Sequence, residues 1–177
     1  MQEYRLTSND NKAAIAFSVA FPERNRPVGG LLVRILEECE YHDTSKANAV
    51  VKGLDWQGDG NCAAIAEGAE VMEVIAVLEG SEKNLRGGNG IKANPVKGDS
   101  LLHMKSSKDG VEFTITKKFT KTVDPEKPKK GKKGEKVEDA KPKLVTFEVK
   151  RTYTISKWEA QAIAQALRSS IQFIVFG

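Results

Sequence analysis

The sequence predicts an α+β fold in which an antiparallel sheet followed by a helix occurs twice. The main observation is the order of the periodic segments, because three strand patterns and then one helix pattern occur in each half of the chain. The two helix patterns also place glutamate, apolar, apolar and serine residues at matching positions. We therefore expect a single domain, 1–177, built of two repeats at about 1–86 and 91–177.

The first half opens with the clearest strand of the sequence. In residues 12–21 large apolar side chains alternate with alanine and serine, which is the two-residue period of a strand. The apolar run 31–36 fits a strand or a helix, and we favour a strand because Gly29–Gly30 precede it, as expected for a hairpin partner. Residues 37–59 are mainly polar, and we interpret them as a loop.

A third strand and a helix complete the first half. The strand is expected at 61–66 and the helix at 70–78, where Gly80 is placed to end it. The glycine-rich segment 87–90 follows the helix, and such a run of glycine and asparagine is typical of a loop. We interpret it as the connector that separates the two repeats.

The second half has the same order of elements. A strand at 101–105 and an alternating strand at 111–116 flank Asp109–Gly110, a pair of residues typical of a hairpin turn. The segment 122–143 then holds eight lysines against five acidic residues, together with prolines and glycines. Such a segment cannot bury enough apolar surface to fold alone, so we expect a flexible insert.

The chain ends with a well-marked strand and helix. Residues 144–155 alternate between apolar and polar side chains and are rich in β-branched residues, which predicts a strand. Ser156 with Glu159 three positions later is a capping-box pattern, which predicts that a helix begins near Trp158. Apolar residues on both helices exceed what one small sheet face can cover, so we expect a homo-oligomer.

Composition and charge exclude several classes of protein. The hydrophobic fraction is 40% and the charged fraction 29%, as in ordinary soluble globular proteins, and no apolar run approaches the roughly 18 residues of a membrane span. Cys39 and Cys62 are too few for a disulfide framework, and the chain opens without a leader pattern. We therefore expect an intracellular protein, cytoplasmic or associated with the nucleoid.

Motifs for catalysis and for metal binding are not evident in the sequence. It contains no phosphate-binding loop, nucleophile elbow or His-Glu-x-x-His motif, and the acidic residues within 37–40 are most simply a solvated surface. Cys39 and His42, with Cys62 and His103 further away, match no standard zinc spacing. We therefore expect no enzyme activity, no cofactor and no metal site.

Four short segments, spread over most of the chain, match a known pattern. They are Asn11–Ile15, similar to the end of a Lys-Gly-Lys-Ala-Ala-Leu signature; Gly29–Leu32, similar to a Gly-x-x-Leu-Leu strand start; Leu54–Trp56, similar to a Tyr-Asp-Trp segment; and Asp109–Gly110 with the strand, helix and terminal Phe-Gly that follow. Together they resemble the Whirly family of single-stranded DNA-binding proteins. Asp10 replaces the first lysine of the signature, and the lysine-rich insert has no counterpart in the pattern.

The resemblance implies both a fold and an assembly. The family fold has two four-stranded antiparallel sheets, each followed by a helix, akin to a fused dimer of the positive-cofactor-four coactivator type. It also implies that the homo-oligomer is a tetramer or a dimer. The function it implies is the binding of single-stranded DNA, largely without regard to sequence, in replication, recombination or repair.

The residues themselves are compatible with this function. Single-strand binders combine cations for the phosphates with aromatic surfaces on which bases stack, and each stacked base contributes about 1–3 kcal/mol. By alternation we expect Phe17, Phe113 and Phe147 to face the core, which leaves other aromatic residues for stacking. The candidate binding residues are Lys12, Trp56, Lys105, Lys108, Lys117, Lys118, Phe119, Lys121, Lys150, Arg151 and Tyr153.

Three other functions would use the same features. An RNA-binding or RNA-annealing module would use the same basic sheet, and a transcription cofactor would bind DNA together with a polymerase. A structural or assembly protein would use the sheets as protein interfaces and bind no nucleic acid. Surface lysines are most often simply solvated, so the sequence leaves these alternatives open.

Overall fold

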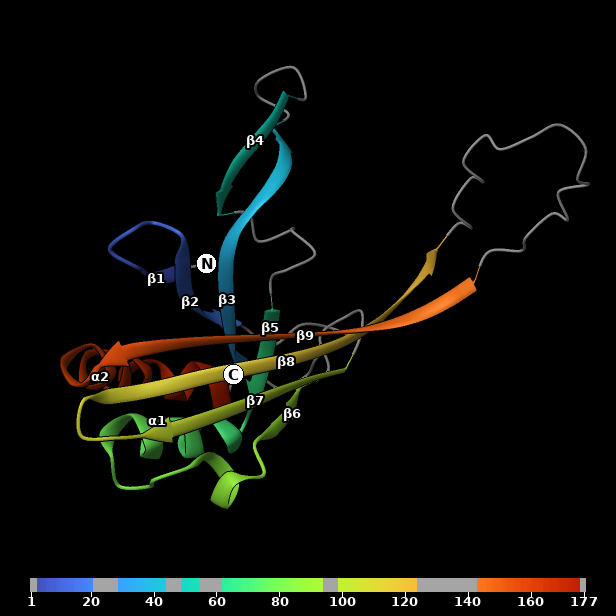
Figure 1. Ribbon diagram of the computed structural model, residues 1–177. Coiled ribbons are helices and arrows are strands. Elements are labelled where there is room, and N and C mark those ends of the chain that lie inside the picture. The colour runs from blue at the N-terminus through green and yellow to red at the C-terminus, as the bar shows by residue number, and fades with distance from the viewer. Residues whose placement is uncertain are drawn as a thin grey trace, which may run out of the picture.

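Two antiparallel sheets that run crosswise, with two α-helices packed against them, make up the described part of the chain (Figure 1). The computed structural model describes residues 3–20, 29–43, 49–54, 62–93, 99–123 and 143–175. Each sheet is followed in the chain by one of the helices. The predicted α+β class, with a sheet and then a helix in each half, is confirmed.

The first sheet is built around one long strand, β3. β2 pairs antiparallel with the inner part of β3, as the expected hairpin requires. On its other side β3 pairs with β5 along the inner part and with β4 along the outer part. The elements of this half are β1 (Glu3–Thr7), β2 (Ala13–Ala20), β3 (Gly30–Asp43), β4 (Ala49–Leu54), β5 (Cys62–Glu67) and α1 (Glu70–Glu79).

The second sheet has the sequential order β6-β7-β8-β9. Its two long strands, β8 and β9, have 14 residues each and pair along their whole length. In the turn between β7 and β8 the backbone N–H of Ser107 donates to the carbonyl of Gly110, which confirms the predicted hairpin. The elements of this half are the 3₁₀ turn η2 (Leu85–Gly88), β6 (Ile91–Ala93), β7 (Asp99–Ser106), β8 (Gly110–Val123), β9 (Lys143–Ser156) and α2 (Lys157–Val175).

The predicted loop at 37–59 is wrong, because much of it is strand. β3 continues to Asp43, and 49–54 returns beside it as β4. The described side chains at the start of this part, 37–39, are not buried, so they do not have to alternate between apolar and polar. For the same reason β8 and β9 extend into both ends of the predicted insert, whose residues 124–142 lie outside the described part. The short strands β1 and β6 were not expected.

One hydrophobic core joins both sheets and both helices. At its centre Phe17 of β2 and Phe113 of β8 meet edge to face, with ring centroids 5.4 Å apart, so the two residues lie in the core as predicted. Burying a side chain of this size contributes about 1.5–3 kcal/mol to folding. The largest fully buried side chains are Phe113, Ile15, Leu31, Ile35, Ile75, Leu85, Ile91, Leu102, Ile115, Ile155 and Val33.

Similar hydrogen bonds begin both helices. The N–H of Ser156 donates to Glu159 Oε2 at 2.7 Å, and the N–H of Glu159 donates to Ser156 Oγ at 3.3 Å, which is the predicted capping box of α2. Before α1 the N–H of Glu67 donates to Glu70 Oε2 at 3.0 Å, again across three positions. α1 ends at Gly80, whose φ of +79° is the left-handed conformation expected of a terminating glycine.

A glycine opens the long strand of each sheet. A Cβ atom at Gly30 would lie 2.7 Å from the carbonyl oxygen of Ala66, and one at Gly110 would overlap the carbonyl oxygen of Ile155. Both glycines stand opposite the last residue of the strand that leads into the helix. The two long strands can therefore be compared position by position from these glycines.

An ion pair joins the two helices. Arg168 of α2 donates from Nε and from a terminal nitrogen to the two carboxylate oxygens of Glu79 at the end of α1, at 2.6 and 2.7 Å. Hydrogen bonding to Arg168 holds the pKa of the Glu79 carboxyl below its usual value. The pair places a positive charge beside the C-terminus of α1, where the helix dipole favours a cation.

Candidate nucleic-acid interface

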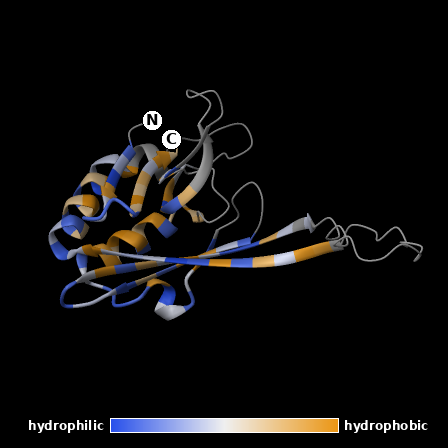
Figure 2. Ribbon diagram, turned by 45° about the horizontal axis from the view of Figure 1, so that its top comes forward, coloured by the Kyte–Doolittle hydropathy of each residue, from blue (hydrophilic) through white to orange (hydrophobic). Residues whose placement is uncertain are grey.

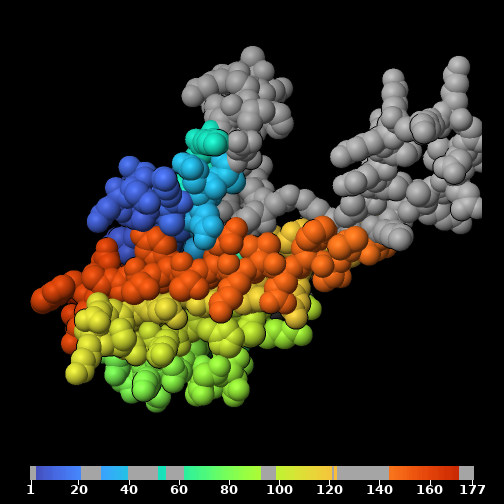
Figure 3. Space-filling view, viewed as in Figure 1, coloured from blue at the N-terminus to red at the C-terminus, as the bar shows by residue number. Residues whose placement is uncertain are grey.

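A two-stranded ribbon extends from the second sheet (Figures 1 and 3). β7 pairs with β8 only as far as Lys118, whereas β8 and β9 continue together to Val123 and Lys143. We call 119–123 and 143–147 the ribbon, and within the described residues no third strand pairs with it. Hydrophobic and hydrophilic segments alternate along it in Figure 2, as expected of strands with two exposed faces.

Strand alternation gives β8 and β9 two faces. The inner face carries Phe113 and Ile115, which are buried in the core, and continues outward along β8 to Lys117 and Phe119. We call the opposite side of the sheet the outer face. The β9 residues in register with these four are Tyr153, Arg151, Val149 and Phe147.

The inner face of the hairpin carries an aromatic pair with a cation beside it. Phe119 and Phe147 are stacked, with ring centroids 5.6 Å apart and an angle of 23° between the planes. Lys117 Nζ lies 5.2 Å from the centre of the Phe119 ring, within the range of a cation–π contact. Phe147 is 39% exposed and its neighbour on the same face, Val145, is 38% exposed. An apolar, cation-flanked surface therefore faces solvent where the core ends.

Arg151 connects this surface to the first sheet. Its Nε lies 3.0 Å from Oε2 of Glu37 in β3, and a terminal nitrogen donates to the carbonyl of Lys150 at 3.2 Å. The Arg151 side chain is 27% exposed and that of Glu37 is 42% exposed. The guanidinium is therefore fixed at the inner end of the aromatic surface, where the two sheets meet.

The outer face carries threonines and lysines, and some of these lysines stand beside acidic residues. Lys118 Nζ lies 3.2 Å from Oε2 of Glu148, Lys105 stands in register with Glu112, and Lys150 is exposed opposite a threonine. The cross-strand hydroxyl pairs are Thr114–Thr152 at 3.0 Å and Thr120–Thr146 at 3.4 Å. Two of the three predicted lysines on this face therefore stand beside a carboxylate.

The predicted binding residues therefore divide between two faces. Lys117, Phe119, Arg151 and Tyr153 belong to the inner face, whereas Lys105, Lys118 and Lys150 belong to the outer face. Of the remaining four, Lys12 lies in the turn before β2, and Lys108 lies in the turn at the end of β8 that is far from the ribbon. Lys121 is at an inner-face position, but its side chain is outside the described part, and Trp56 is outside the described residues altogether.

Tyr153 is more a part of the core edge than of the exposed surface. It is half-buried, packs against the core and stands in register with Phe113. Burial raises the pKa of the Tyr153 hydroxyl, and the nearby charges of Glu159 and Asp10 act in the same direction. The hydroxyl is therefore neutral at physiological pH, and less of its ring is available to a base than at Phe147.

Two residues of this surface were missed from the sequence. Phe147 lies on the inner face, as alternation predicts, but it is not buried, because the strand has already left the core at that point. The sequence signal that could have identified Phe147 as exposed is its position beside the lysine-rich insert. Glu37 was assigned to an acidic loop, and only the continuation of β3 brings it to Arg151.

Metal-ligating side chains do not cluster in the described part of the chain. No group of three or more His, Cys, Asp or Glu residues there could hold a metal ion. The thiol of Cys62 is buried, and burial raises its pKa, which disfavours the reactive thiolate. No helix among the described residues has the length and apolar character needed to cross a membrane.

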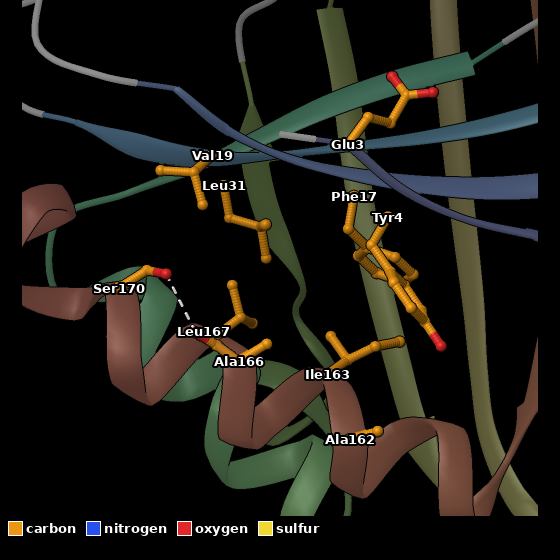
Figure 4. A pocket seen from close by; sticks show the side chains of 10 residues that line it. All are labelled: Glu3, Tyr4, Phe17, Val19, Leu31, Ala162, Ile163, Ala166, Leu167 and Ser170. Atoms are coloured by element: carbon orange, nitrogen blue, oxygen red, sulfur yellow. Dashed lines mark hydrogen bonds between the residues drawn. The ribbon is translucent and has the colours of Figure 1, made fainter. Parts of the chain in front are cut away.

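An apolar groove of about 270 Å³ lies between the first sheet and α2 (Figure 4). Tyr4 and Phe17 point from the strands toward Ile163, and the remaining lining is mostly alanine and aliphatic. The single acid among the lining residues is Glu3, whose carboxylate accepts a hydrogen bond from Arg34 at 2.7 Å. The groove can receive an apolar group but has no arrangement for catalysis.

Comparison with known proteins identifies the fold. No protein-family model and no curated protein matches the sequence. The structure is similar to the crystal structure of WHY3 from Arabidopsis thaliana, with a TM-score of 0.60 and 11% sequence identity, over 98% of this chain and 88% of that one. Both sheets and both helices lie within the matched region. The chain therefore has a Whirly-like fold, as the resemblance of its short sequence segments predicted.

Proposed function

We propose that the protein binds single-stranded DNA along the inner face of the β8–β9 hairpin, without reading its sequence. The observation that carries the proposal is the stacked pair Phe119–Phe147, exposed on a ribbon and flanked by Lys117. Bases of a single strand expose their flat faces, and aromatic side chains bind any of the four bases by stacking. The Whirly-like fold supports the proposal, because the family resemblance implies the same ligand.

The cations near the aromatic pair suit a sugar-phosphate backbone. Lys117 and Arg151 both lie on the inner face, one on each strand of the hairpin. An Arg guanidinium can hold two phosphate oxygens at once. Contacts of this kind carry no sequence information and weaken as salt increases. A protein of this type would protect or organise single-stranded DNA in replication, recombination or repair, with no catalytic step of its own.

A homo-oligomer, a tetramer or a dimer, is the second part of the proposal. Trp158 on α2 is 83% exposed and Met72 on α1 is 43% exposed, and a second copy packed against the helices would cover them. The sheets would then carry DNA while the helices face other copies. Light scattering after gel filtration tests this directly, and a mass equal to one chain would contradict it.

Fluorescence anisotropy with labelled oligo-dT, oligo-U and a duplex, each across a salt series, tests the ligand. We expect oligo-dT to bind most tightly and to weaken as salt increases. Tighter binding of oligo-U would assign the site to RNA, because the same stacking surface accepts its bases. Equal affinity for the single strand and the duplex would refute the proposal, since it would show attraction to phosphate alone.

A further inference from the structure

The long strands of the two sheets carry opposite charges at equivalent positions. Counted from Gly30 and Gly110, the buried residues of β3 and β8 match one another: Leu31 with Val111, Val33 with Phe113, and Ile35 with Ile115. The next position on the same face of each strand is Glu37 in β3 and Lys117 in β8. The position after it is Glu38 in the first sheet and Lys118 in the second. The first sheet therefore presents acid where the second presents base.

Glu37 contacts a cation of the second sheet directly. Its Oε2 lies 3.0 Å from Arg151 Nε, and both side chains are partly exposed. A carboxylate oxygen and a phosphate oxygen carry the same charge and accept the same guanidinium hydrogen bonds. Glu37 therefore occupies a place at Arg151 that a nucleic-acid phosphate could also take.

We propose that Glu37 competes with phosphate for Arg151 and so marks the end of the nucleic-acid path on the second sheet. The inference rests on the proposed function of the inner face. A strand that follows Phe147 and Phe119 toward Arg151 meets Glu37, whose negative charge repels the next phosphate. The strand is thereby confined to the second sheet, and each binding event has to replace the Glu37 carboxylate at Arg151.

The substitution Glu37→Gln tests the competition, because it removes the charge and keeps the shape. A partly exposed ion pair of this kind is modest in energy, so E37Q should bind oligo-dT about two- to fivefold more tightly at low salt. The additional phosphate contact should make the dependence of log Kd on log salt steeper by about 0.7.

Glu148→Gln is the matched control. It makes the same change of charge on the same hairpin, but Glu148 pairs with Lys118 on the outer face. E148Q should leave the salt slope unchanged and show only the small gain that any lost negative charge gives. In an Arg151→Gln background, E37Q should show no more than the small gain of E148Q, because the competition for Arg151 is then absent.

Three results would overturn the inference. The first is an E37Q protein that behaves as E148Q does. The second is a gain from E37Q in the R151Q background that is as large as its gain in the wild-type background. The third is that the wild-type protein binds single-stranded and duplex DNA equally tightly, which would refute the proposed function itself. This result would be recognised before any variant is made. Melting curves verify that the variants fold, and Glu37→Asp, which keeps the charge on a shorter side chain, should show a smaller gain than E37Q.

Discussion

Replacing Phe147 with alanine is the most direct test of the aromatic surface. Loss of one stacked base costs about 1–3 kcal/mol, so F147A should bind oligo-dT about 5- to 150-fold more weakly in anisotropy titrations at fixed salt. The effect on folding should be of similar size. A ring that is 39% exposed contributes about 1–2 kcal/mol by burial, and its pairing with Phe119 about 0.5–1.5 kcal/mol more. Because the ribbon lies outside the core, this loss of stability should be confined to the ribbon.

Two further variants separate stacking from packing. Phe147→Leu keeps most of the apolar contact with Phe119 but has no flat ring, so it should retain stability and lose affinity. Leu144→Ala removes an apolar side chain that is 76% exposed on the outer face of the same strand, and it should leave affinity unchanged. An F147L protein that binds as tightly as the wild type would show that no base stacks on this residue.

Three more predictions concern the fold. Gly110→Ala should destabilise the protein by more than about 3 kcal/mol in urea unfolding, because the new Cβ would overlap the Ile155 carbonyl in the neighbouring strand; an unchanged midpoint would contradict this. Ser156→Ala should cost about 1 kcal/mol through loss of the α2 cap, and a loss within measurement error would mean that the cap is dispensable. Arg168→Gln should lower the melting temperature at neutral pH: because Arg168 depresses the pKa of Glu79, its stabilisation is present above the usual pKa of 4.5 and is lost as pH falls through the lower folded value. A difference between the two proteins that does not shrink in acid would refute this account.

The elements that face the core could be predicted from the sequence. The alternation of β2, the turn at Asp109–Gly110 and the capping box of Ser156 with Glu159 are each set by neighbouring residues and by one buried face. Such signals are local, so a single sequence contains them. They were sufficient to predict that each half contains a sheet followed by a helix.

The outer parts of β3 and β8 could not be predicted, whereas the strand predicted at 144–155 agrees with β9. Beyond Leu36 in β3 the described side chains, 37–39, are no longer buried, so the alternation ends and the extension to Asp43 resembles a loop in the sequence. The same loss of constraint explains the exposed Phe147, which alternation assigned to the core. The division of the lysines between two faces follows from the register of β8 with β9, which is a long-range property of the chain.

The open sides of the ribbon expose it to aggregation. Within the described residues its strands have no neighbour except each other, and apolar side chains such as Leu144 and Val145 are exposed on it. Unpaired strand edges of this kind can recruit strands from other molecules, and lysine is the residue that most often prevents such pairing. Lys117 and Lys118 stand at the last positions where β7 still pairs with β8, next to the ribbon, and their charges would oppose such pairing. Any attempt to weaken DNA binding by neutralising them should be accompanied by a measurement of precipitation against protein concentration.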